Sequence, residues 1–154
     1  MANQHTYLLE PGLWTMEGIY RDREDSPHRQ TGQILVVHAP GLWTIESQLS
    51  ISGQDARDFE TRYDVSPMPQ GRSFTEWKSI SNGPEPIFGL FVLVEDAIMM
   101  PWESESGIYW GQEVLSRVAP DEYRCRGFAF IKREKVSSWA VRMARADQGQ
   151  AMGE

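Results

Sequence analysis

The sequence lacks features on which several classes of protein depend, beginning with cysteine and histidine. Cys125 is its single cysteine, so the chain cannot form an intrachain disulfide and its fold must be stabilised by packing. The three histidines, His5, His28 and His38, match no zinc-binding spacing. We expect His38, at the end of a strand, to be a surface histidine rather than a haem ligand, and we predict neither a metal nor a cofactor.

Long apolar runs and an excess of basic charge are also missing. No segment approaches the roughly 20 apolar residues that a membrane helix needs. The polar N-terminus does not resemble a secretory signal. The 22 acidic residues outnumber the 15 basic ones, and the net charge of -7 repels the phosphates of nucleic acids. We therefore expect a soluble, cytoplasmic protein without nucleic-acid or membrane partners.

The motifs of common enzyme classes are absent as well. The sequence contains no phosphate-binding glycine loop, dinucleotide fingerprint or nucleophile elbow. Cys125 shares a strand face with the small residues Gly127 and Ala129, which predicts a buried packing thiol rather than a nucleophile. The sequence alone therefore assigns no reaction to the chain.

Short apolar-rich segments separated by turn-forming residues fill the chain instead. In the segment 57–65, the aromatic Phe59 and Tyr63 fall on one face and the acidic Asp58 and Glu60 on the other. Such a two-residue period is typical of β-strands. We predict ten strands, at 12–20, 32–38, 42–52, 57–65, 72–80, 87–94, 96–102, 107–117, 122–131 and 138–145.

The order of these segments favours a closed barrel. Short consecutive strands joined by short turns tend to pair with their neighbours along the chain, and closing such a meander removes its exposed edges. Six Trp, five Tyr and six Phe favour an interior cavity over a solid aliphatic core. We predict an all-β fold, an antiparallel up-and-down β-barrel of about 8–10 strands. It occupies residues 12–145, between an N-terminal segment at 1–11 and a flexible tail at 146–154.

The start of the first strand carries a family resemblance. Gly12 and Trp14 resemble the Gly-x-Trp signature of the lipocalins and their relatives, the calycins. Two later segments are similar to small bacterial calycin-like proteins, 107–115 and 121–126. The resemblance implies a calycin-like barrel in which Trp14 closes the floor and a basic residue of the last strand packs across it. Arg142 and Arg145 are the candidates for that partner.

Nine aromatic or charged residues on these strands are candidates to bind a ligand, although the face that points into the barrel is left open. Arg124 and Arg126 share a face with nearby phenylalanines, an arrangement suited to a ligand carboxylate, as in fatty-acid-binding barrels. Alternatively, the two arginines face water and pair with Glu113 across strands. The nine candidates are Trp14, Tyr63, Trp77, Tyr109, Trp110, Glu113, Tyr123, Arg124 and Arg126.

Three functions remain open at this stage. The first is binding of a small apolar or amphipathic molecule inside the barrel. The second is a calycin-like enzyme of the cyclase, isomerase or decarboxylase type, which would use Tyr, Glu and Arg side chains in the cavity. The third is a homodimeric interaction protein with a filled barrel, because the segment 87–94 is apolar on both faces and suits coverage by a second subunit.

Overall fold

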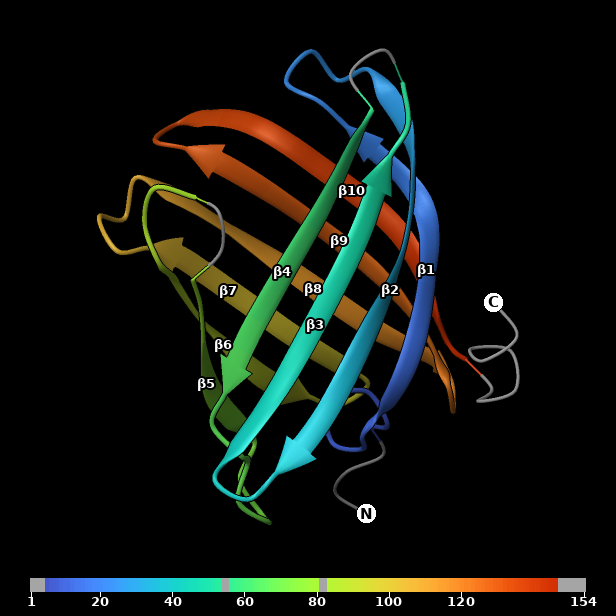
Figure 1. Cartoon of the computed structure of the whole chain (residues 1–154), viewed down its shortest axis with the longest axis vertical. Helices are drawn as coiled ribbons and strands as arrows, with labels where there is room; N and C mark the ends of the chain where they lie inside the picture. The colour runs from blue at the N-terminus through green and yellow to red at the C-terminus, as the bar shows by residue number, and fades with distance from the viewer. Residues whose placement is uncertain (1–4, 54–55, 81–82, 147–154) are drawn as a thin grey trace.

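Ten antiparallel strands form a closed barrel in this computed structural model, which describes residues 5–53, 56–80 and 83–146 (Figure 1). Each strand pairs with its neighbours in the chain, so the all-β up-and-down barrel predicted from the sequence is confirmed. Of the tail predicted at 146–154, residues 147–154 lie outside the described residues. The strands are β1 (Gly12–Arg21), β2 (Pro27–Ala39), β3 (Leu42–Ile51), β4 (Arg57–Val65), β5 (Phe74–Ser79), β6 (Ile87–Val94), β7 (Ala97–Ser104), β8 (Tyr109–Ala119), β9 (Glu122–Ile131) and β10 (Glu134–Arg145).

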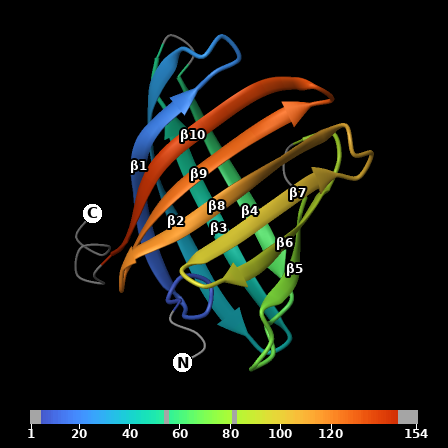
Figure 2. The ribbon, with the colours of Figure 1, turned by 180° about the vertical axis from the view of Figure 1, so that it is seen from behind.

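The barrel closes where the first strand meets the last. Trp14 of β1 lies opposite Arg145 of β10, and Tyr20 lies opposite Trp139. The two strands run side by side in both views of the ribbon (Figures 1 and 2). This pairing leaves no open edge between the two ends of the sheet, which removes the most common site of strand aggregation.

Two strands begin earlier than the sequence predicts. The charged segment between β1 and β2 is a tight hairpin in which Arg21 pairs with Pro27. The Asp22 carboxylate accepts hydrogen bonds from the backbone N–H groups of Glu24 and Ser26, both at 3.0 Å. Because the Asp22 side chain satisfies these backbone N–H groups within a short turn, β2 can begin at Pro27. The later turn is similarly short, so β10 begins at Glu134.

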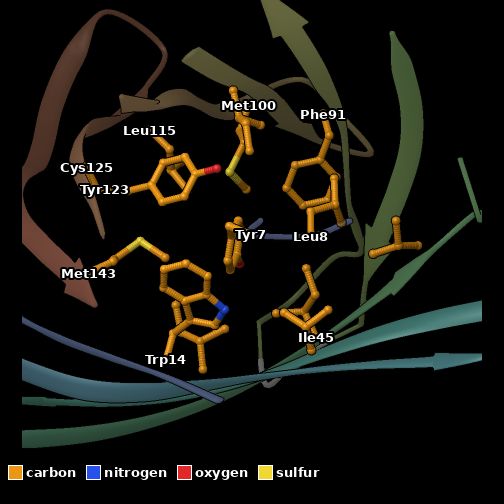
Figure 3. Packing of buried hydrophobic residues seen from close by; sticks show 14 of the residues in the cluster. Tyr7, Leu8, Trp14, Ile45, Phe91, Met100, Leu115, Tyr123, Cys125 and Met143 are labelled. Carbon is orange, nitrogen blue, oxygen red and sulfur yellow. The ribbon is translucent and has the colours of Figure 1, made fainter. Parts of the chain in front are cut away.

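The N-terminal segment closes one end of the barrel. The Glu10 N–H donates to the Thr6 carbonyl at 3.1 Å, which forms a single turn before Pro11. This turn inserts Tyr7 and Leu8, which are 3% and 0% exposed, among the side chains of the strands (Figure 3). Figure 3 places Tyr7 in the middle of a ring that includes Trp14, Tyr123, Met143, Leu115, Phe91 and Ile45.

Trp14 and Arg145 complete this floor. The Arg145 guanidinium carbon lies 5.8 Å from the centre of the Trp14 indole, close enough for a cation–π contact. The same guanidinium donates to the Glu10 carboxylate at 2.8 Å and to the Pro11 carbonyl at 2.9 Å. Of the two arginines that the resemblance offered, Arg145 is therefore the one that packs across Trp14.

Large and small residues alternate around the inner wall. Three tryptophans lie over glycines directly opposite them on the next strand, namely Trp77 over Gly89, Trp102 over Gly111 and Trp139 over Gly127. A Cβ atom on any of these glycines would approach the facing indole to within 2.4 or 2.5 Å. The glycines thus allow three indoles to lie flat against the wall, which keeps the centre of the barrel open.

Candidate functional site

A cavity of about 340 Å³ occupies the interior above the Tyr7 floor. Side chains from all ten strands line it, and most of them are aromatic or aliphatic. This volume lies at the small end of the range of roughly 300–1,000 Å³ that is typical of ligand pockets. The structure therefore provides a partly enclosed space suited to one small molecule.

Glu113 is the one acidic or basic residue of the cavity wall among the described residues. It lies on the inner face of β8, opposite Gly127 of β9, and Gly127 in turn lies opposite Trp139 of β10. Because Gly127 has no side chain, the Trp139 indole spans it and its Nε1–H donates to Glu113 Oε2 at 2.7 Å. The Cys125 thiol donates to the same oxygen at 3.2 Å.

These contacts set the charge states at the centre of the cavity. Burial raises the pKa of the Glu113 carboxyl above its usual value of 4.5, while the hydrogen bonds from Trp139 and Cys125 act against that rise. Burial and the nearby Glu113 also raise the pKa of the Cys125 thiol well above 9.0. The thiol is therefore protonated at neutral pH, and the expected buried packing cysteine also proves to be a hydrogen-bond donor.

Several phenols share this space. Tyr7 and Tyr63 have pKa values raised mainly by burial and further by Glu113, so both are neutral donors. The Tyr63 ring contacts Trp77 at a centroid distance of 4.7 Å, and the Tyr109 ring contacts Trp102 at 4.8 Å. No hydrogen bond within the described part of the chain engages the hydroxyl groups of Tyr7, Tyr63 or Tyr109. These hydroxyls are available to a ligand.

The structure brings together four of the nine residues proposed from the sequence. Tyr63, Trp77, Tyr109 and Glu113 all line the cavity. Trp77 faces inward together with Thr75 and Ser79. Two more, Trp14 and Tyr123, are fully buried in the floor, where the Tyr123 hydroxyl hydrogen-bonds His5 Nδ1 at 2.7 Å. Whether any of these residues contacts a ligand stays a prediction.

The other three residues, Trp110, Arg124 and Arg126, lie on the outer surface, which settles the face that the sequence left open. Strand alternation turns Tyr123 and Cys125 inward, so Arg124 and Arg126 must face outward, and both are exposed. Neither makes the alternative ion pair with Glu113, because that carboxyl lies on the other side of the sheet. Trp110 is 37% exposed and stacks on the outer face of Phe130 at a centroid distance of 5.0 Å.

Sequence reasoning missed other members of the site. Tyr7 lies outside the strands, so no alternation pattern marked it. Trp139 and Trp102 belonged to predicted strands or their edges, but their importance depends on the glycine opposite each, which only the register reveals. A tryptophan one strand away from a glycine in a predicted meander is the signal that could have found them.

The described residues hold neither a metal-ligand cluster nor a long apolar helix. No group of three or more His, Cys, Asp or Glu in these ranges could hold a metal ion. Within the same ranges, no helix combines the length and hydropathy needed to cross a membrane.

The outer wall of β5 to β8 carries a second, more open hollow, bounded by residues such as Lys78, Phe88 and Trp110. Phe88 is 42% exposed there, so the segment 87–94 is apolar on its outer face as the sequence indicates. Trp77 and Trp102 line both this hollow and the barrel cavity.

Comparison with known proteins supports the fold. We found no family model and no curated protein that matches the sequence. The S-type phycobiliprotein lyase CPES from Guillardia theta is structurally similar, with a TM-score of 0.61 and 8% identity over 90% of this chain and 89% of that one. The structure of EF1p2_mFAP2b bound to DFHBI is also similar, with a TM-score of 0.51 and 14% identity over 94% and 98% of the two chains. At these identities the likeness shows a shared lipocalin-like barrel fold.

Proposed function

We propose that this protein is a calycin-like barrel that binds one small, largely aromatic or apolar molecule in its internal cavity. The observation that carries the proposal is a partly enclosed space of about 340 Å³ inside the barrel that side chains do not fill. Its wall combines apolar rings with the hydroxyl groups of Tyr7, Tyr63 and Tyr109, which no hydrogen bond within the described residues engages. This combination is typical of ligand pockets, in which apolar contact provides affinity and isolated polar groups fix orientation.

The similar structures provide a precedent for this use of the fold. EF1p2_mFAP2b was solved bound to DFHBI, and CPES is described as a phycobiliprotein lyase. The third function considered from the sequence, a filled barrel, fits the open interior poorly. Pairing with a second copy through the outer face of β6 stays a prediction.

A matched pair of variants on β4 tests the proposal. Thr61 lines the cavity, whereas its neighbour Glu60 is exposed on the outer face. Titration calorimetry with a panel of fatty acids, retinoids, aromatic acids and aromatic amines should find at least one ligand of the wild type. Thr61→Trp should then abolish binding by filling the space, and Glu60→Trp should leave it unchanged. Binding that survives Thr61→Trp in a folded protein would place the ligand elsewhere and overturn the proposal.

A catalytic use of Glu113 is the second candidate. A carboxyl whose pKa is raised by burial, beside neutral phenols, is suited to donate and recover a proton during an isomerisation. Under this candidate, Glu113→Gln would abolish turnover of a bound ligand while the ligand still bound. A bound ligand that the wild type releases chemically unchanged would favour simple binding.

A further inference from the structure

The two oxygens of the Glu113 carboxyl differ in their surroundings. Oε2 accepts the hydrogen bonds from both Trp139 and Cys125. None of the hydrogen bonds in the described ranges reaches Oε1, and Glu113 lines the cavity. A carboxylate oxygen can accept two hydrogen bonds. Oε1 therefore offers unused acceptor capacity in a space that water must leave when a ligand enters.

The cavity wall has no positive charge to balance this acid. The lining residues in the described ranges include no lysine, arginine or histidine. Arg124 and Arg126 are on the outer surface. Arg117, two positions beyond Leu115 on the inner face of β8, influences the pKa values of His5 and Tyr123 at the floor and does not line the cavity. An anionic ligand would thus meet a buried carboxyl with no cation to offset the repulsion.

Beside Glu113 the cavity wall also presents neutral hydrogen-bond donors and aromatic faces. Tyr7, Tyr63 and Cys125 bring neutral hydroxyl and thiol groups, and the tryptophans of the wall bring electron-rich rings. Aromatic rings attract cations through their faces, and a carboxylate forms its strongest hydrogen bonds with a charged nitrogen donor. Both the aromatic faces and the carboxyl favour a ligand with a positively charged nitrogen.

We propose that the ligand of this cavity carries a basic nitrogen on an apolar or aromatic body, and that this nitrogen donates to Glu113 Oε1. This inference rests on the proposed binding function and adds the chemical class of the ligand. It differs from the ligand carboxylate that was one of the two alternatives for Arg124 and Arg126, because both arginines face solvent.

Three ligands of matched size test the inference, namely 2-naphthylmethylamine, 2-naphthylmethanol and 2-naphthoate. Calorimetry at neutral pH measures the Kd of each for the wild type, for Glu113→Gln and for Glu103→Gln. Glu103 is exposed on the outer face of β7, so its variant makes the same chemical change outside the cavity. Thermal melting of each variant checks that it is folded.

We expect the wild type to bind the amine about tenfold or more tightly than the alcohol, since a hydrogen bond to a charged group contributes that much, and to bind the carboxylate most weakly. In Glu113→Gln the advantage of the amine over the alcohol should disappear while the alcohol still binds. Glu103→Gln should behave as wild type.

Failure of the nitrogen inference and failure of the proposed binding function give different results. If the alcohol or the carboxylate binds as tightly as the amine, or if Glu113→Gln keeps the amine preference, the nitrogen inference is wrong and the binding function stands. If none of the three binds the wild type and no member of the wider panel does either, both proposals are overturned.

Discussion

Trp139 of β10 donates a hydrogen bond to Glu113 of β8 at 2.7 Å, passing over the intervening strand at Gly127. The contact joins residues that are two strands apart, and it exists because the position between them has no side chain. It fixes the orientation of the acid, flattens the indole against the wall and keeps the space in front of both of them open. The stability of the barrel and the chemistry of its cavity therefore depend on one glycine.

Gly127→Ala should destabilise the protein by about 1–3 kcal/mol, the usual effect of forcing extra atoms into a packed interior. The new Cβ would lie 2.4 Å from the Trp139 ring, so the indole must move and lose its bond to Glu113. Urea unfolding measures the loss. Gly83→Ala is the matched control, because the nearest atom would be 3.9 Å away, and it should change the free energy of unfolding little. Equal stability of both variants would contradict the packing described here.

The buried acid should make stability depend on pH. Because the pKa of Glu113 is raised above its usual 4.5, the folded protein keeps a proton that the unfolded chain has already released. Its contribution to stability is therefore complete below about 4.5 and is lost as the pH rises through the raised pKa. Asp22 and Glu122, whose pKa values are lowered by His28 and Arg142, contribute with the opposite sign.

Comparison with Glu113→Gln isolates this effect, since the surface carboxylates are common to both proteins. The free energy of unfolding of the wild type minus that of the variant should decrease steadily as the pH rises from 4.5 through the raised pKa. Urea titrations at a series of pH values measure it. A difference that stays constant over this range would show that Glu113 titrates normally.

Cys125 should be inert in the folded protein. It is 2% exposed and the pKa of its thiol is strongly raised. A reagent therefore has little access to the sulfur, and at neutral pH the thiol is not ionised to the reactive thiolate. Iodoacetamide should alkylate the native protein at least about a hundredfold more slowly than the urea-unfolded chain, as followed by mass spectrometry. Rapid alkylation of native protein would mean that the cavity wall opens at β9.

Arg145 should matter more to stability than Arg142 on the same strand. Arg145 contacts Trp14, Glu10 and the Pro11 carbonyl, whereas Arg142 forms an exposed pair with Glu122. We expect Arg145→Ala to cost about 1–2 kcal/mol through the lost cation–π contact and hydrogen bonds. Arg142→Ala should stay within about 0.5 kcal/mol. Thermal or urea unfolding compares the two, and equal losses would argue against a special role for the floor contact.

The strands were predictable from the sequence because two-residue alternation and turn residues are local signals. Both are clear in β4, whose predicted bounds of 57–65 match the structure. The same local reading missed the starts of β2 and β10, because a side-chain hydrogen bond such as that of Asp22 can tighten a turn that composition alone presents as a loop.

The site was predictable only in part, for a physical reason. Alternation separates the two faces of a strand but does not say which face points into the barrel. Charged residues identify the outer face only where the other face of the same strand is apolar. Glu113 shares its face with Leu115, and it was found. Arg124 and Arg126 alternate with Tyr123 and Cys125, and aromatic residues on both sides of β9 concealed the direction of the barrel interior.

A crystal structure of the wild type with 2-naphthylmethylamine at ten times its Kd tests the central claim most directly. The account predicts electron density for the naphthyl ring inside the barrel, above Tyr7, with the amine within hydrogen-bond distance of Glu113 Oε1. An empty interior, or density confined to the outer hollow beside Phe88 and Trp110, would contradict it.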